Sequence, residues 1–286
     1  MKNSYVSVNG IRINVSEWGG SGRELLFAHP TGFLGAVWEP VIRALRDRGF
    51  EGRVITFDQR GHGLSSKPDD GYKWESFVSD LEALMAALDL EGVVGVGHSG
   101  GATTIAGVAA ANPARFDRLV LVDPILFDRQ TDGEYGEMDN PMSSRTRTRR
   151  LVWPSRKTLF EAFAAKPPYD SWSEEALRAY VEYGTFERPD GEIELLCPGR
   201  IEAQVYANAL ASDGFSHLGS LAMPVVLVRG EQSDSFPIER ARRALGELTQ
   251  GRLIAMSDTT HFVPMERPGA LADLILEEVG AAGKAP

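Results

Sequence analysis

One stretch constrains the fold of this chain more than any other. An apolar run, Val93 to Val96, leads through glycines to Ser99 and continues as a small, helix-favouring segment from Ala102 to Ala111. This order of residue types predicts a strand, a tight turn and a helix. The serine lies in the pattern Gly97-x-Ser-x-Gly101, which is typical of a nucleophile elbow, a strained turn that exposes a serine hydroxyl. Ser99 is therefore a candidate nucleophile.

The same stretch also fits a second pattern. Gly95, Gly97 and Gly100 spell Gly-x-Gly-x-x-Gly between a predicted strand and a predicted helix, which is a dinucleotide-binding fingerprint. Asp123 follows the next apolar run at about the spacing that a ribose-binding acid needs. Since either pattern is weak alone, the rest of the chain has to distinguish the two interpretations.

Strands and helices alternate on both sides of this stretch. A β-hairpin is predicted around Asn9-Gly10, because a type I′ turn needs positive φ at both central residues. Strands are expected over residues 5–8, 11–15, 24–29, 53–57, 93–97, 118–122, 224–229 and 252–256. Most are separated by amphipathic helical patterns. The alternation predicts an α/β fold with a mostly parallel eight-stranded sheet flanked by helices.

The alternation is interrupted from Pro124 to about Leu218, where no clear strand is expected. Patches rich in Trp, Tyr and Phe in this segment have helix-like character. We therefore predict an α/β core made of residues 1–124 and 218–286. Residues 125–217 are predicted to form an inserted helical lid over the carboxyl edge of the sheet.

A serine nucleophile needs a base that takes up its proton and an acid that orients the base. In this architecture the three follow the order serine, acid, histidine, and among the five histidines His261 fits best because it follows the last predicted strand. Asp234 follows the strand before it, so both loops are expected at the edge of the sheet where Ser99 lies. The predicted triad is Ser99, Asp234 and His261, which the dinucleotide interpretation leaves unexplained.

Two backbone N–H groups are needed to stabilise the oxyanion that forms when a serine attacks a carbonyl. Gly100 supplies one at the start of the helix. The second is expected from Thr31 in the loop after the third strand, since Pro30 has no N–H.

Together these motifs resemble those of the α/β-hydrolase superfamily, in its lidded serine esterase and lactonase-like branch. The matching pieces, in chain order, are His29-Pro30-Thr31-Gly32-Phe33 with Trp38, the loop Asp58 to Ser65, Gly97 to Gly101, Gly230-x-x-x-Asp234, and His261 to Pro268. The first piece reads His-Pro where the family usually has His-Gly. The pieces extend over the whole predicted core, whereas the lid shows no family pattern.

The resemblance implies hydrolysis of a carboxylic ester or lactone of a small, largely apolar molecule through an acyl-enzyme, with no metal or organic cofactor. Carbon–carbon bond hydrolysis and cofactor-free perhydrolysis use the same triad and remain alternatives. A small-molecule receptor with a retained triad is the alternative from another class. Some members carry the acid after the strand that follows the nucleophile, which makes Asp123 the alternative to Asp234.

Three further observations concern the lid and the residues that face it. Phe33 and Trp153 are candidates for lining a substrate pocket, or they pack lid against core. The arginine-rich run at 145–150 is interpreted as a solvated face or an anion site, with the acidic loop at 128–140 as its partner. Cys197, the single cysteine, is interpreted as a packing residue.

The net charge of −10 argues against a general binder of nucleic acid or of anionic membranes. The first residues lack the apolar core of a signal peptide, and no apolar run approaches membrane-spanning length. We therefore expect a cytoplasmic protein, a monomer or homodimer, whose partner is a small-molecule substrate.

Overall fold

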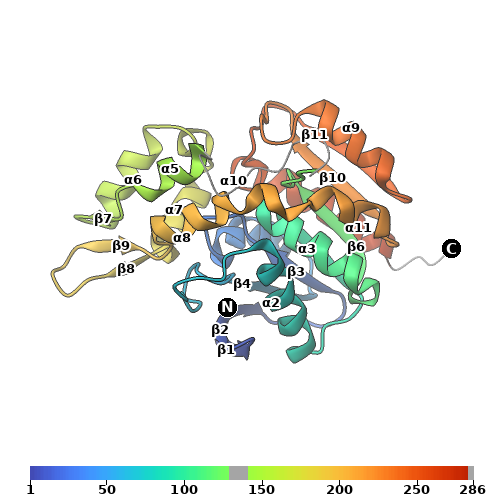
Figure 1. Cartoon of the computed structure of the whole chain (residues 1–286), viewed down its shortest axis with the longest axis horizontal. Coiled ribbons are helices and arrows are strands. Elements are labelled where there is room, and N and C mark those ends of the chain that lie inside the picture. Colours follow the sequence, from blue (N-terminus) through green and yellow to red (C-terminus); the bar gives the residue numbers. More distant parts are fainter. Residues whose placement is uncertain (129–140, 283–286) are drawn as a thin grey trace.

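The computed structural model describes residues 1–128 and 141–282. Its main sheet has eight strands (Figure 1). Their spatial order is β1 (Lys2–Val8), β2 (Ile11–Trp18), β4 (Arg53–Phe57), β3 (Glu24–Ala28), β5 (Val93–His98), β6 (Phe116–Val122), β10 (Val225–Gly230) and β11 (Gly251–Met256). The β1–β2 and β2–β4 pairs are antiparallel and the other five pairs are parallel, which confirms the predicted mostly parallel eight-stranded sheet.

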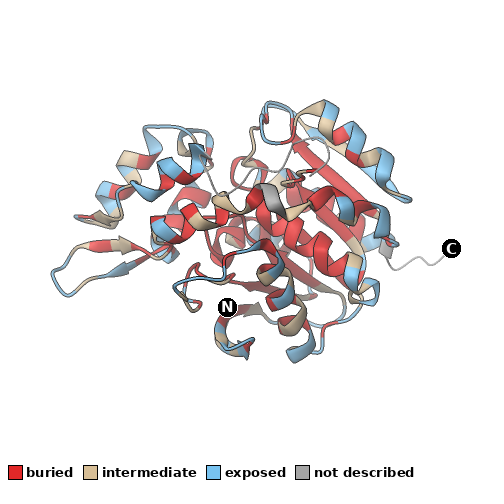
Figure 2. Ribbon diagram, in the orientation of Figure 1, coloured by how far each residue is buried: buried red, intermediate tan, exposed pale blue. Residues whose placement is uncertain are grey.

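Helices cover both faces of this sheet because its strands are apolar on both sides. In β3, Leu25 and Phe27 belong to the core shared with α1 (Glu39–Asp47) and α11 (Pro268–Ala282). Leu26 and Ala28 face the opposite core, shared with α2 (Trp74–Ala87), α3 (Gly100–Ala111) and α9 (Ile238–Glu247). This two-residue alternation is the strand period. Figure 2 shows the buried strands between helices whose outer faces are exposed.

The described part of the segment between β6 and β10 lies largely to one side of the main sheet (Figure 1), and we refer to it as the cap. Its described helices are α5 (Pro141–Arg147), α6 (Arg156–Ala164), α7 (Glu174–Tyr183) and α8 (Gly199–Ala207). The expectation of no strand in this segment is wrong. The strands β7 (Val152–Trp153), β9 (Ile193–Leu195) and β8 (Thr185–Glu187) form a small antiparallel sheet in that order. Strands of two or three residues are too short to show a period-2 pattern in the sequence.

Short helical turns complete the described chain. They are the 3-10 helices η1 (Gly35–Trp38), η2 (Pro113–Arg115), η3 (Tyr169–Ser171), η4 (Ala209–Ser212) and η5 (Gly214–Ser220), and the four-residue α10 (Val263–Glu266). None of the helices in residues 1–128 and 141–282 is both long and apolar enough to cross a bilayer.

Aromatic side chains join the cap to the core. The ring of Phe33 lies 4.8 Å from that of Tyr180 in α7, and the ring of Trp172 lies 5.4 Å from that of Phe262. The cap therefore contacts the core at Phe33, which follows the predicted oxyanion loop, and at Phe262, which follows His261.

Candidate active site

Ser99 lies in a strained turn between β5 and α3. Its φ of +56° and ψ of −123° lie in a region that residues with a side chain rarely adopt. A Cβ added to Gly97 would come within 2.5 Å of the Cα of Ala102, and one added to Gly101 would collide with the carbonyl of Ala28. Glycine is therefore required on both sides of the serine, as expected for a nucleophile elbow.

His261 is oriented by a buried carboxylate. Its Nδ1 lies 2.6 Å from Oδ1 of Asp123, which has no exposed surface. The same carboxylate accepts hydrogen bonds from the Ser233 hydroxyl at 2.7 Å and from the Gly230 N–H at 3.0 Å. An acid on Nδ1 leaves Nε2 of the imidazole to take up a proton, which is the arrangement of a general base.

The position of the acid corrects the sequence prediction, because Asp123 and not Asp234 lies at His261. Asp234 is exposed in the turn after β10, where the neighbouring Ser233 points inward. Asp123 has a left-handed φ of +44°, so the chain turns directly at the end of β6. The predicted 230–234 loop thus contributes hydrogen-bond donors to the acid rather than the acid itself.

The elbow and the histidine–aspartate pair lie at the ends of neighbouring strands. The Ser99 N–H donates to the carbonyl of Val122, the residue before Asp123, at 2.9 Å. His98, directly before the serine, places its Nε2 2.8 Å from the carbonyl oxygen of His261. No hydrogen bond joins the Ser99 hydroxyl to His261 in the described chain, a contact that commonly tightens only when substrate binds.

The two predicted oxyanion residues, Thr31 and Gly100, lie next to each other. A Cβ on Gly100 would come within 2.8 Å of the Thr31 hydroxyl oxygen. Among the described residues, neither backbone N–H donates a hydrogen bond. Two N–H groups without an acceptor beside a candidate nucleophile meet the chemical need of an oxyanion hole.

Two buried histidines hold this oxyanion loop in place. Nε2 of His62 accepts from the Gly32 N–H at 3.0 Å, and its Nδ1 donates to the Arg60 carbonyl at 2.8 Å. His29 accepts from the Gln59 N–H at 2.9 Å. Burial lowers the pKa of His29 to about 4 and that of His62 to about 3, so both rings are neutral.

Glu266 anchors the loop that carries His261. Its carboxylate accepts from the Thr260 N–H at 2.7 Å and from the Thr260 hydroxyl at 2.6 Å, and it also accepts from Ser171 of the cap at 2.7 Å. The sequence analysis placed Glu266 in the matching motif after His261 but assigned it no role. The signal that pointed to it was its spacing of five residues from the histidine.

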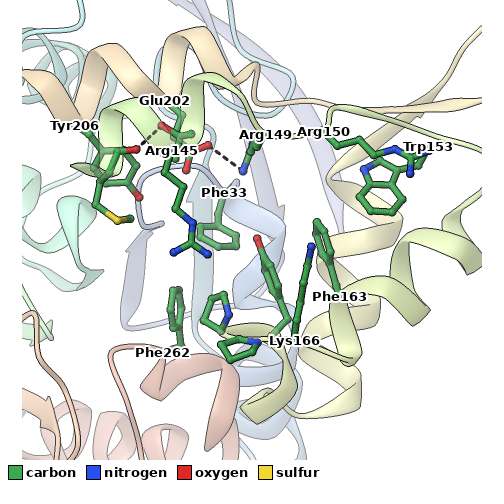
Figure 3. A pocket seen from close by; sticks show the side chains of 15 residues that line it. Phe33, Arg145, Arg149, Arg150, Trp153, Phe163, Lys166, Glu202, Tyr206 and Phe262 are labelled. Atoms are coloured by element: carbon green, nitrogen blue, oxygen red, sulfur yellow. Dashed lines mark hydrogen bonds and ion pairs between the residues drawn. The ribbon is translucent and has the colours of Figure 1, made fainter. Parts of the chain in front are cut away.

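A cavity of about 450 Å³ lies between the cap and this edge of the core (Figure 3). Phe33, which follows the oxyanion loop, and Phe262, which follows His261, both line it, so it lies beside the candidate catalytic residues. Trp153 also lines it. Among residues 1–128 and 141–282, no three His, Cys, Asp or Glu side chains lie together as metal ligands would.

The half-buried Arg149 and the buried Glu202 form an ion pair in the wall of this cavity. Their side chains approach to 2.9 Å, and the guanidinium also donates to the Cys197 carbonyl at 2.8 Å. Burial raises the pKa of the Glu202 carboxyl, and it raises that of the Cys197 thiol to about 12. A Cβ on Gly32 would come within 2.5 Å of Oε1 of Glu202, so the pair also touches the oxyanion loop.

The other cavity-lining arginines of the 145–150 run have different surroundings. Arg150 stacks its guanidinium 4.2 Å from the centre of the Trp153 ring. Arg145 is exposed and points into the cavity (Figure 3). The acidic loop predicted to pair with this run lies, from residue 129 to 140, outside the described residues.

Comparisons with known proteins identify the family of the chain. The model of the alpha/beta hydrolase family matches residues 25–274. The chain is 32% identical over 230 residues, 80% of its length and 77% of the relative's, to a 2-(acetamidomethylene)succinate hydrolase from Mesorhizobium japonicum (strain LMG 29417 / CECT 9101 / MAFF 303099). It is 22% identical over 280 residues, 91% and 93% of the two lengths, to the bifunctional esterase/perhydrolase DCH of Acinetobacter calcoaceticus. A crystal structure of E-2-(acetamidomethylene)succinate hydrolase superposes with a TM-score of 0.82 at 26% identity, covering 98% of this chain and 99% of that one. The chain therefore belongs to the alpha/beta hydrolase family.

Proposed function

We propose that this protein is a serine hydrolase that cleaves a carboxylic ester or lactone of a small molecule through an acyl-enzyme. The observation that carries the proposal is the 2.6 Å contact between His261 and buried Asp123 beside a serine in an elbow. A serine held at such a turn has little purpose in packing. With a base and two N–H groups beside it, it has what acyl transfer needs.

In the proposed reaction the Ser99 oxygen attacks the carbonyl carbon while Nε2 of His261 takes up the hydroxyl proton. The oxyanion of the tetrahedral intermediate accepts hydrogen bonds from the N–H groups of Thr31 and Gly100. The intermediate then collapses, and the leaving alkoxide receives the proton from His261. Water, deprotonated by the same imidazole, attacks the acyl-enzyme and releases the carboxylic acid.

The names of the relatives support the reaction class but leave the scissile bond open. One relative is named an esterase and perhydrolase, and another is named for an acetamido compound. Amide hydrolysis and perhydrolysis are therefore alternatives that use the same residues. A panel of esters, lactones and amides, with and without hydrogen peroxide, distinguishes them by the products formed.

A fluorophosphonate probe tests the nucleophile. We expect labelling of one serine, mapped to the peptide that contains Ser99, and no labelling of the Ser99→Ala protein. Labelling of another serine, or none in the folded wild-type protein, would overturn the mechanism. Tight binding of small acyl compounds without turnover would instead favour a receptor.

A further inference from the structure

The cavity beside the candidate triad carries an excess of positive charge. Four cationic side chains line it, Arg145, Arg149, Arg150 and Lys166, whereas Glu202 is the one carboxylate among the described lining residues. Apolar rings form much of the remaining wall. An excess of cations in a partly enclosed cavity favours an anionic ligand, because a low dielectric strengthens the attraction.

Two of these cations already have partners. Arg149 is paired with Glu202 at 2.9 Å. Arg150 donates from Nε to the Val152 carbonyl at 2.8 Å and stacks on Trp153. Both guanidinium groups therefore have structural roles in the cap wall.

The other two cations have no polar partner among residues 1–128 and 141–282. Within the part of the chain that the structure describes, the side chains of Arg145 and Lys166 make no hydrogen bond and no ion pair. The Lys166 ammonium lies 5.4 Å from the centre of the Phe163 ring, and Arg145 points into the cavity (Figure 3). Their charges are available to a ligand in the space between cap and core.

We propose that Arg145 and Lys166 bind a carboxylate of the substrate, so that the enzyme acts on small acyl compounds with a free carboxylate remote from the scissile bond. A guanidinium is suited to a carboxylate because its planar donors match the two oxygens. Phe33 and Phe262, between the cations and the candidate triad, would contact the carbon chain that joins the two groups. A volume of about 450 Å³ accommodates a molecule of this size.

This inference rests on the proposed hydrolysis, and a comparison of matched esters tests the hydrolysis and the carboxylate recognition separately. We would compare the monomethyl esters of succinic, glutaric and adipic acid with neutral analogues in which an amide replaces the free carboxylate. At the best chain length we expect kcat/KM to be at least about tenfold higher for the acid than for its amide, the worth of one charge-assisted hydrogen bond. Added salt should reduce this ratio because the cations are exposed.

Variants of α5 provide a matched pair. In Arg145→Ala the acid-to-amide ratio is expected to fall about tenfold or more, toward 1, and Lys166→Ala is expected to lower it as well. Arg147→Ala removes the same charge from the same helix at an exposed position that does not line the cavity, and it should leave the ratio unchanged. An equal fall in Arg145→Ala and Arg147→Ala would reduce the effect to general charge and overturn the inference.

Failure of this inference and failure of the proposed function would give different results. If the wild-type protein hydrolyses the neutral esters but gains nothing from the carboxylate at any length, the inference is wrong and the proposed function stands. If no ester is cleaved, calorimetry with glutarate on the wild-type protein still tests the inference. Binding lost in Arg145→Ala and kept in Arg147→Ala supports it, whereas no binding, or tighter binding of inorganic phosphate, overturns it.

Discussion

The polar groups on the two sides of the cavity, the core edge and the cap, differ in whether they have partners within the described protein. At the core edge the acid and its supporting groups already have hydrogen-bond partners within the protein. Asp123 accepts two hydrogen bonds besides its contact with His261, and both ring nitrogens of His62 are hydrogen-bonded. Across the cavity, Arg145 and Lys166 have no polar partner among the described residues. On the proposed reaction, the groups that perform the chemistry are preorganised, while the cations proposed to select the substrate are left to bind a ligand.

The largest expected effect comes from replacing Asp123, the acid at the core edge. Asp123→Asn should lower kcat for an ester by about 10⁴, because an amide leaves His261 in the wrong tautomer. Asp234→Asn makes the same change in the exposed turn nearby and should alter kcat less than about twofold. Steady-state kinetics on folded proteins measure both. A reversed outcome would mean that the working acid is Asp234.

The choice of acid also shows which parts of the fold and the site can be predicted from the sequence. The elbow follows from steric rules at Gly97 and Gly101, and the hairpin follows from Asn9 and Gly10, which have φ of +47° and +76°. The acid does not follow in this way, because two aspartates end neighbouring strands. Which of them faces His261 depends on one left-handed residue, Asp123, and on which side chains of the next loop point inward.

The cap was less predictable for a related reason. Its strands contain two or three residues, too few to show a period-2 pattern, and β7 pairs with β9 far along the chain. The arginine run looked uniform in the sequence, yet Arg149 is half-buried and paired with Glu202 while Arg145 is exposed. Tertiary contacts alone decide which arginine is structural.

The next largest effect is expected from breaking the Arg149–Glu202 ion pair, which contacts the oxyanion loop at Gly32. Glu202→Gln leaves the Arg149 guanidinium buried without a counter-charge and should lower the free energy of unfolding by about 3 kcal/mol. Glu247→Gln, an exposed carboxylate of α9, should change it by less than about 0.5 kcal/mol. Urea unfolding followed by circular dichroism measures the difference, and equal losses would contradict a structural role for the pair.

The pH dependence of the free energy of unfolding tests whether His62, which holds the oxyanion loop, is neutral in the folded protein. Burial lowers the pKa of His62 to about 3, whereas an unfolded histidine titrates near pH 6.5. Between these values the unfolded chain binds a proton that the folded chain does not, so acidification favours unfolding by about 1.4 kcal/mol per pH unit for this residue. The contribution of His62 to stability is therefore lost as the pH falls from about 6.5 toward 3.

The variant His62→Gln isolates that contribution, since an amide oxygen can still accept from the Gly32 N–H. Its free energy of unfolding should depend less steeply on pH than that of the wild-type protein, by about 1.4 kcal/mol per unit. The comparison of slopes cancels the buried carboxyls Asp58 and Glu202, whose raised pKa values act in the opposite sense. Equal slopes would mean that His62 is protonated in the fold.

The smallest effect concerns the support of the acid. Ser233→Ala removes one hydrogen bond to Asp123 and should lower kcat about tenfold, with little change in KM. Ser235→Ala, an exposed serine of the same turn, is the matched control and should leave kcat unchanged. A loss confined to KM would indicate that Ser233 contributes to substrate binding instead.

The central claim is that Ser99 becomes acylated, and trapping the intermediate tests it most directly. The wild-type protein is mixed with an activated ester such as p-nitrophenyl acetate, quenched in acid within the first turnover, and weighed intact by mass spectrometry. We predict a gain equal to one acyl group, mapped by fragmentation to Ser99 and absent in Ser99→Ala. Turnover of the ester with no adduct on Ser99, or an adduct on another residue, would contradict the account.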